Sequence, residues 1–139
     1  MALWLMKSEP DAYSWDDLNA EGEGTWDGVR NHTAAIHLKA MQVGDRAFFY
    51  HSNIGKEIVG IVTISATAFP DPTEPEGTRW VAVKVKPVKP LKQPVTLAQI
   101  KAEPRLAGME LIRQSRLSVA PVREAEWALL MEMAQTADD

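Results

Sequence analysis

The sequence predicts an α+β domain in which short helices surround a curled, mixed β-sheet. Strand patterns and short helix patterns follow one another without strict alternation, which is typical of this class. The chain has 139 residues, of which 45% are hydrophobic, and this is enough for one domain with its own core. Because the expected sheet is small, curling or closure would hide its edges, and this favours a curled sheet over a flat one.

Local signals place the elements of the first half of the chain. Ser14 is a suitable N-cap because Asp17 follows three residues later, as in a capping box. Asn31 is a suitable N-cap for a second helix, in which apolar side chains recur on one face. The expected elements are a strand over residues 2–7, a short helix after Ser14, an ordered loop over 26–30, a helix from Asn31 to about Met41 and a strand over 46–52.

The second half of the chain reads as two strands followed by short elements. Gly60 interrupts the first strand, where we expect a bulge or a close approach of another group to the backbone. Pro87 and Pro90 either end the second strand or place it at a sheet edge. The expected elements are a strand over 58–69, a loop over 70–77, a strand over 80–86, a helix from Thr96 to about Ala102, a β-like segment over 117–119 and a helix over 124–133. Residues 1–135 are expected to form a single domain, and residues 136–139 a frayed tail.

Composition excludes several kinds of site and partner. The formal net charge is −4, which argues against a protein that coats DNA through phosphate contacts but allows one that holds a single base. The absence of cysteine excludes disulfides, thiolate nucleophiles and thiolate metal sites, and a cytoplasmic location is expected. The apolar start of the chain ends at Lys7, too early for a secretion signal or a membrane span, so no membrane partner is expected.

The usual catalytic and cofactor motifs are missing from the sequence. His32 and His37 are five residues apart, which places them about 140° apart on a helix and prevents joint binding of a metal ion. His51 and Ser52 are strand neighbours, so they point to opposite faces and do not form a hydrolase pair. No glycine-rich phosphate loop is present. The sequence therefore predicts no metal, no cofactor and no catalytic residue, and it favours a binding module over an enzyme.

Polar groups set among aromatic residues form the candidate binding site. Segment 26–31 combines a large ring, a flexible glycine and the cation Arg30 just before a helix N-terminus, where a phosphate can bind. Trp26 can stack on a nucleic-acid base, which contributes ~1–3 kcal/mol in single-strand binders. In the alternative reading, Trp26 is a core residue and Arg30 pairs with Asp27 or Asp45.

Further candidate groups lie elsewhere in the chain. Trp15 and Trp80 lie near loops and are additional candidates for stacking on a base. Trp4 and Trp127 lie on regular elements and are expected in the core. Segment 50–52 ends a strand with hydroxyl and imidazole groups that can read the edge of a base.

Four segments of the chain together carry a resemblance to a known family. They are Lys7-Ser8-Glu9-Pro10, Trp26-Asp27-Gly28-Val29-Arg30-Asn31, Phe48-Phe49-Tyr50-His51-Ser52 and Arg113-Gln114-Ser115-Arg116-Leu117-Ser118-Val119. In this order they resemble the EVE domain family, and the resemblance covers the chain from Leu3 to about Met133. It implies a PUA-like fold, that is, a curled mixed β-barrel with peripheral short helices, related to PUA, ASCH and YTH domains.

The resemblance also implies a non-catalytic module that binds DNA or RNA and recognises a modified base, notably a modified cytosine, in an aromatic and polar cleft. Trp26 would stack on a flipped base, and Asn31 with the strand-end groups would read its edge. Lys7, Arg30 and Arg116 would hold flanking phosphates. Family members are often fused to nucleases, so a protein effector is a further expected partner. The implied ligand-binding residues are Lys7, Ser8, Trp26, Gly28, Val29, Arg30, Asn31, Tyr50, His51, Ser52, Trp80, Arg113, Gln114, Arg116 and Ser118.

Two other functions stay open from the sequence. An amidohydrolase-like enzyme on the same PUA- and ASCH-like scaffold would need a lysine paired with a glutamate or a threonine in the cleft, and the candidate pair is Lys7 with Glu9 or Glu57. An adaptor would use the cleft for a peptide or a metabolite. The sequence also leaves open the base, its modification, the choice between DNA and RNA, the stacking tryptophan and the oligomeric state.

Overall fold

A six-stranded sheet organises the computed structural model, which describes residues 1–75 and 79–137. Its elements in chain order are β1 (Leu3–Ser8), α1 (Trp15–Glu21), β2 (Gly24–Trp26), α2 (His32–Ala40), β3 (Arg46–His51), β4 (Glu57–Pro70), β5 (Val81–Thr96), α3 (Leu97–Ala102), the 3₁₀ helix η1 (Pro104–Leu106), α4 (Glu110–Arg113), β6 (Val119–Pro121) and α5 (Glu124–Met133). The strand order is β2-β5-β4-β3-β1-β6.

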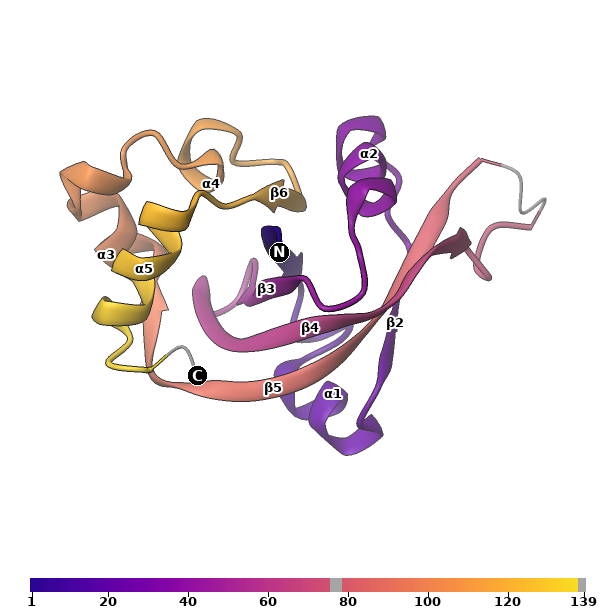
Figure 1. Cartoon of the computed structure of the whole chain (residues 1–139), viewed down its shortest axis with the longest axis horizontal. Coiled ribbons are helices and arrows are strands. Elements are labelled where there is room, and N and C mark those ends of the chain that lie inside the picture. The colour runs from indigo at the N-terminus through magenta and orange to yellow at the C-terminus, as the bar shows by residue number, and fades with distance from the viewer. Residues whose placement is uncertain (76–78, 138–139) are drawn as a thin grey trace.

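The sheet is mixed and strongly curved. β1 runs parallel to β3, whereas the other neighbouring strands are antiparallel. The long β4–β5 pair curves under β3 in Figure 1, with α3, α4 and α5 gathered on one side and α2 with β2 on the other. The register of this pair shifts at four places, and such irregularities bend a strand and increase its twist. The predicted α+β class with a curled mixed sheet is therefore confirmed.

Alternating side chains of the sheet enter two different cores. On β3, Phe49 belongs to the core that α1 and α2 cover, whereas Phe48 and Tyr50 belong to the core beneath α3, α4 and α5. This follows from the two-residue repeat of a strand, which sends neighbouring side chains to opposite faces. Trp4 and Trp127, which were expected in the core, are only 6% and 3% exposed. Phe49 and Tyr50, which are neighbours on β3, therefore contribute to different cores.

The predicted helix starts are confirmed by their caps. The Ser14 hydroxyl accepts a hydrogen bond from the Asp17 N–H (3.0 Å), and the Asp17 carboxylate accepts one from the Ser14 N–H (2.9 Å). Asn31 Oδ1 accepts from the Ala34 N–H at 2.9 Å. Thr96 and Gln99 form the same reciprocal arrangement at the start of α3. Each such cap contributes about 1 kcal/mol, because it satisfies N–H groups that the helix itself leaves free.

The prolines of β5 do not end the strand. The strand continues past Pro87 and Pro90 to Thr96, so the expected stop is wrong and the expected edge is right. Within the described residues, β2 pairs only with Val83–Val85, and the later part of β5 has strand β4 on one side alone. A residue without a backbone N–H is tolerated there because no ladder hydrogen bond is lost.

Both expectations for Gly60 are confirmed. The register of β4 against β5 shifts between Ile58 and Gly60. The indole of Trp15 also approaches this backbone closely, because a Cβ added at Gly60 would lie 2.6 Å from Trp15 Cζ2. Trp15 is one of the residues through which α1 packs onto the sheet, and its ring meets Phe49 edge-on at 5.5 Å.

Several short elements were not predicted. β2 occupies part of the expected loop, and η1 and α4 lie where no helix was expected. The β-like segment expected at 117–119 begins only at Val119. These elements have three or four residues, too few for a periodic pattern, and they depend on partners distant in the chain. Of the expected loop 70–77, Pro70 ends β4, and residues 76 and 77 lie outside the described part of the chain.

The expected tail begins at a residue that is held to the domain. The Thr136 N–H donates to the Met131 carbonyl at 3.0 Å, and the Thr136 hydroxyl accepts from the Lys92 N–H at 2.9 Å. The last two residues of the expected tail, 138 and 139, lie outside the described part of the chain.

Candidate functional site

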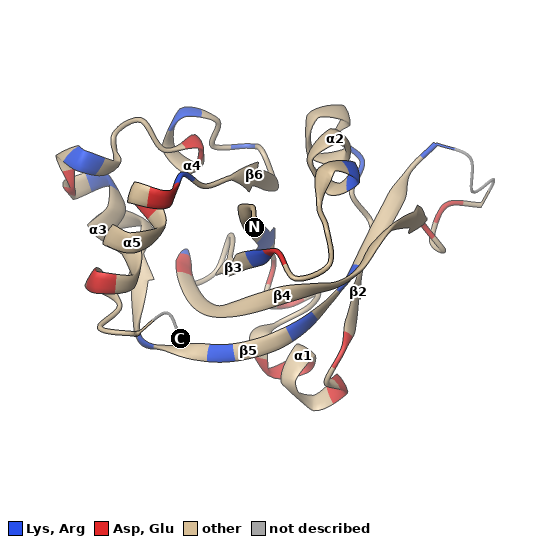
Figure 2. Cartoon of the chain, in the orientation of Figure 1, with Lys and Arg blue, Asp and Glu red and all other residues tan. Residues whose placement is uncertain are grey.

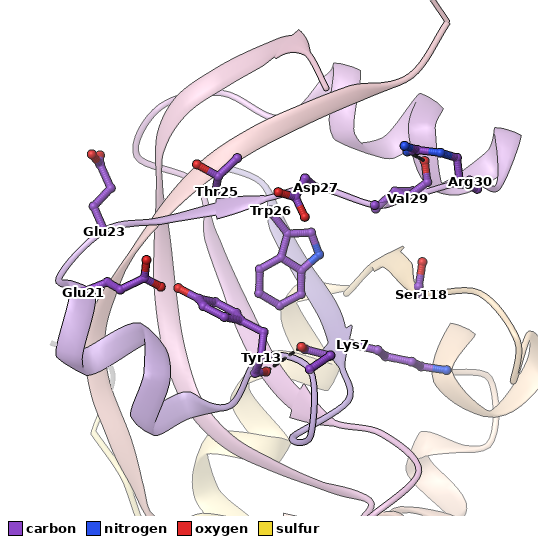
Figure 3. Close-up of a pocket in the computed structure, with 13 residues that line it drawn as sticks. Lys7, Tyr13, Glu21, Glu23, Thr25, Trp26, Asp27, Val29, Arg30 and Ser118 are labelled. Carbon is purple, nitrogen blue, oxygen red and sulfur yellow. Dashed lines mark hydrogen bonds between the residues drawn. The ribbon is translucent and has the colours of Figure 1, made fainter. Parts of the chain in front are cut away.

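A cavity of about 610 Å³, here called the main cavity, lies between the end of β1, the loop that leads into α1, and β2 with the loop that follows it. Figure 3 shows it with residues that line it. Seven of the predicted site residues meet there, namely Lys7, Ser8, Trp26, Gly28, Val29, Arg30 and Ser118. The other lining residues are Ala12, Tyr13, Glu21, Glu23, Thr25 and Asp27.

Trp26 is both a core residue and a wall of the main cavity. Only 6% of its surface is exposed, and its ring packs edge-on against Phe49 (5.3 Å between ring centroids) and Tyr13 (6.4 Å). The two readings of Trp26 from the sequence are therefore not exclusive. Trp15 and Trp80 do not line this cavity, so Tyr13 supplies its second ring.

Asp71 fixes the loop that carries one wall. Its carboxylate accepts hydrogen bonds from the Gly28 N–H (2.8 Å) and the Arg30 guanidinium (2.9 Å), and also from Thr73. The Asp71 side chain is fully buried. Burial alone would raise its pKa, but the hydrogen bonds from Thr73, Arg30 and Gly28 outweigh burial and lower the pKa of Asp71 to about 2. Gly28 has a φ of +75°, a conformation that glycine adopts without strain. In this conformation its N–H donates to the Asp71 carboxylate.

The partner of Arg30 differs from both residues suggested by the sequence. Arg30 pairs with Asp71 and not with Asp27 or Asp45. Asp45 is instead buried at the start of β3, where it accepts hydrogen bonds from the Ala2 N–H and the Trp4 indole N–H, both at 3.1 Å. The charge of Arg30 is thus largely matched within the protein, which leaves less of it for a ligand.

The main cavity is acidic at one end. Figure 3 shows Glu21 directed toward the Tyr13 hydroxyl, while Lys7 and Ser118 lie at the opposite end of the view. Burial and the nearby Glu21 raise the pKa of Tyr13, so its hydroxyl stays protonated at neutral pH. Burial, together with the charge of Asp71, raises the pKa of Asp27. Burial lowers the pKa of Lys7.

A side cavity of about 310 Å³ holds three further predicted residues, Asn31, Gln114 and Arg116. The Asn31 side chain is committed to capping α2, so it is held in place at the cavity rim. Arg116 is exposed, and in the described part of the chain its guanidinium makes no hydrogen bond or ion pair. Of these three residues, Arg116 is therefore the cation that is free to bind a ligand.

The strand-end residues lie around a third cavity, of about 540 Å³, which we call the lysine cavity. Tyr50 and Ser52 line it together with Lys7. His51 lines none of the three cavities, and its Nε2 accepts a hydrogen bond from the backbone N–H of Trp15 at 3.1 Å. Burial lowers the pKa of His51, which suits this acceptor role because the neutral ring is favoured. The predicted single cleft is thus divided over three cavities.

Besides His51, two further predicted residues lie outside these cavities. Trp80 packs against His32, with 5.1 Å between ring centroids, and the guanidinium of Arg30 lies 5.7 Å from its ring centre. Arg113 pairs with Glu110 at 3.2 Å on the same helix. The Trp80 ring therefore packs against the Arg30 guanidinium, and Arg113 stabilises α4.

The geometry around Lys7 bears on the alternative of an enzyme. Lys7 Nζ donates to the Ser115 carbonyl at 2.8 Å and lies 5.9 Å from the centre of the Tyr50 ring. Among the described residues, neither Glu9 nor Glu57 forms an ion pair with Lys7 or lines the main cavity. Residues 1–75 and 79–137 also contain no group of three acidic or histidine side chains suited to a metal ion.

Sequence reasoning missed the acidic end, Tyr13 and Asp71. Tyr13 directly precedes the helix cap Ser14, and this position beside a fixed helix start was an available signal. Asp71 gave no signal, because its partner Gly28 is 43 residues away in the sequence.

A curled mixed sheet with a partly aromatic cavity at the end of its first strand defines a ligand-binding domain with the PUA-like fold. The sequence model of the EVE domain family matches residues 2–133, and the chain belongs to this family. Across residues 1–75 and 79–137, no helix combines the length and hydropathy needed to cross a bilayer.

Three similar proteins place the chain within the family. The NMR structure of Rpa0253 from Rhodopseudomonas palustris is 56% identical with a TM-score of 0.91, over 97% of this chain and 94% of that one. Thymocyte nuclear protein 1 of Mus musculus is 34% identical, over 96% of this chain and 74% of the relative. The human THYN1 protein, crystallised in complex with DNA that contains 5-methylcytosine, is 31% identical with a TM-score of 0.91, over 99% of each chain.

Proposed function

We propose that this chain recognises a modified cytosine, flipped out of a nucleic-acid strand into the main cavity, and that it does so without catalysis. The observation that carries the proposal is the main cavity itself, in which the aromatic wall of Trp26 and Tyr13 lies between an acidic end and Lys7. The complex of the human relative with DNA that contains 5-methylcytosine supports this choice of ligand. In this proposal the protein acts in the cytoplasm.

The cavity has the size and lining that a flipped base requires. Its volume of about 610 Å³ lies within the range of sites for single small ligands. A flipped base loses its stacking partners, and aromatic side chains in the pocket replace them. A methyl group on the base adds apolar surface, and burying one such group contributes about 0.8 kcal/mol. The main cavity thus offers a reason to prefer a methylated base over the unmodified one.

Asp27 is the carboxylate that we assign to reading the edge of the base. Glu23 accepts a hydrogen bond from the Ser65 hydroxyl at 2.7 Å, and Glu21 faces Tyr13. Asp27 accepts none from another residue in the described part of the chain. A carboxylate accepts a hydrogen bond from the exocyclic amino group of cytosine, and thymine or uracil has no such donor at this position.

Asp27→Asn should reduce the preference for a cytosine-type base over thymine by about tenfold, because the amide can donate to a carbonyl as well as accept. Competition between otherwise identical oligonucleotides measures this preference. Glu23→Gln is the matched control, since Glu23 lines the same cavity but is already bound to Ser65. An unchanged preference in Asp27→Asn would show that Asp27 does not read the base.

The proposal is tested by the affinity for labelled oligonucleotides, as DNA and as RNA, that differ only in one base: cytosine, methylcytosine, hydroxymethylcytosine or methyladenine. Trp26→Phe should weaken binding of the preferred base about tenfold, since stacking contributes ~1–3 kcal/mol. We choose phenylalanine over alanine because Trp26 also packs in the core. Trp127→Phe is the matched control, because Trp127 stacks on Phe48 in the other core (3.8 Å).

Two results would contradict the proposal. Equal affinity for all the bases would show that no base is recognised. An equal loss of affinity in Trp26→Phe and Trp127→Phe would show that the effect comes from stability and not from the main cavity.

A further inference from the structure

The lysine cavity differs in charge from the main cavity. Among the described residues, its lining includes Lys7, Lys56 and Lys101 but no aspartate or glutamate. The main cavity is lined by three carboxylates and two cations, one of which is paired with Asp71. Figure 2 shows that acidic residues also gather on α1 and lysines along β5, whereas α3, α4 and α5 together carry both signs of charge. In a chain with a net charge of −4, a cavity with cations alone is a specific feature.

Two of the three lysines of this cavity are free to bind an anion. Lys56 and Lys101 are exposed, and within residues 1–75 and 79–137 neither side chain makes an ion pair or hydrogen bond. The base of the cavity contains the buried side chains of Tyr50 and Leu111. An ammonium group beside an apolar floor is less screened by water than one on an open surface.

The turn before β4 holds Lys56 in an unusual conformation. Asn53, Gly55 and Lys56 have φ angles of 69°, 89° and 49°, so this turn is left-handed at three positions. The Lys56 carbonyl accepts a hydrogen bond from the Leu97 N–H at 2.8 Å, which ties the turn to the start of α3. A lysine in this region is strained, whereas glycine would adopt it freely. A lysine at this position is thus unfavourable for stability alone.

The lysine cavity adjoins the main cavity at Lys7, which lines both. The Lys7 N–H donates to the Ser118 carbonyl at 2.8 Å, and Lys7 Nζ donates to the Ser115 carbonyl at 2.8 Å. Ser118 lines the main cavity, and Ser115 lines the lysine cavity. The two cavities thus share a wall, and a strand whose base occupies the main cavity passes beside the cavity that Lys56 and Lys101 line.

We propose that the lysine cavity binds a backbone phosphate of a nucleotide adjacent to the recognised base, with Lys56 and Lys101 as its cations. This inference rests on the proposed function for the identity of the ligand. Phosphate contacts fix the register of a strand and do not read its sequence. The two cavities therefore have different roles: the main cavity selects the base, and the lysine cavity binds the backbone of the strand.

The test compares Lys56→Gln/Lys101→Gln with Lys86→Gln/Lys92→Gln. The second pair removes the same charge from exposed lysines of β5 that line none of the three cavities. The affinity for a labelled duplex with one 5-methylcytosine is measured from about 50 to about 200 mM NaCl. Lys56→Gln/Lys101→Gln should lower the slope of log K against log salt by about 2, one for each lysine, and leave the ratio between methylated and unmethylated duplexes unchanged.

Lys56→Gly separates binding from folding. This variant should keep or raise the thermal midpoint, because glycine relieves the left-handed strain, and should still lower the salt slope by about 1. Equal slopes in wild type and Lys56→Gln/Lys101→Gln, with base preference intact, would overturn the phosphate subsite alone. A lowered slope without any base preference in the wild type would support the subsite and overturn base recognition. No binding by the wild type would overturn both.

Discussion

Gly60→Ala should lower the free energy of unfolding by about 3 kcal/mol, near the upper end of the usual range for overpacking a core. The added Cβ would lie 2.6 Å from both Trp15 Cζ2 and Trp15 Cζ3, and real Cβ contacts are not that short. Trp15 cannot easily move away, because its ring packs against Phe49 and its backbone N–H donates to His51 Nε2. Urea unfolding, with the midpoint compared at constant slope, measures the effect.

Gly108→Ala is the matched control for this change. Gly108 lies between η1 and α4, and a Cβ added there would meet no atom within 4 Å. The same substitution should therefore be neutral or stabilise by about 0.5 kcal/mol, since alanine restricts the unfolded chain. The double variant Trp15→Leu/Gly60→Ala should be less unstable than the sum of its single changes, because the smaller side chain leaves room. Additive effects would place the cause of the destabilisation outside this contact.

Helix starts could be read from the sequence because their contacts are local. Ser14 and Asp17 are three residues apart, and so are Asn31 and Ala34, so spacing alone identifies the cap. β2 depends on pairing with β5, from which it is separated in the chain by α2, β3 and β4. Such a pairing has no local pattern, and a short strand that depends on it reads as a loop.

The candidate site was predicted as one cleft because the order of its segments in the sequence does not show on which face of the sheet each side chain lies. Phe49 and Tyr50 are neighbours on β3, yet Phe49 contacts Trp26 and Tyr50 faces the other core. Tyr50 and Ser52 therefore reach the lysine cavity, whereas Trp26 lies in the main cavity. The alternation of a strand contained this information, but only the order of the strands in the sheet shows which face each cavity occupies.

Asp71→Asn should lower the free energy of unfolding by about 2 kcal/mol at pH 7 and by almost nothing at pH 2. The folded protein holds the pKa of Asp71 at about 2, below its ordinary value of 3.8. Each difference of one in pKa corresponds to about 1.4 kcal/mol. Because the folded pKa is the lower one, this stability is fully present above about pH 4 and is lost as the pH falls toward 2. Urea unfolding at several pH values, taken as wild type minus variant, isolates this contribution from those of other carboxylates.

Asp71→Asn should also weaken binding of the preferred oligonucleotide by at least about tenfold, because the loop with Gly28 and Arg30 loses the charge that orders it. Asp45→Asn is the matched control, since Asp45 is also buried and hydrogen-bonded but lines none of the three cavities. This control should lose stability and keep its affinity when both are measured on folded protein. If both variants bind as the wild type does, the loop does not need Asp71 to form the wall of the main cavity. A loss of affinity in Asp71→Asn alone would establish that a carboxylate outside the cavity determines its shape.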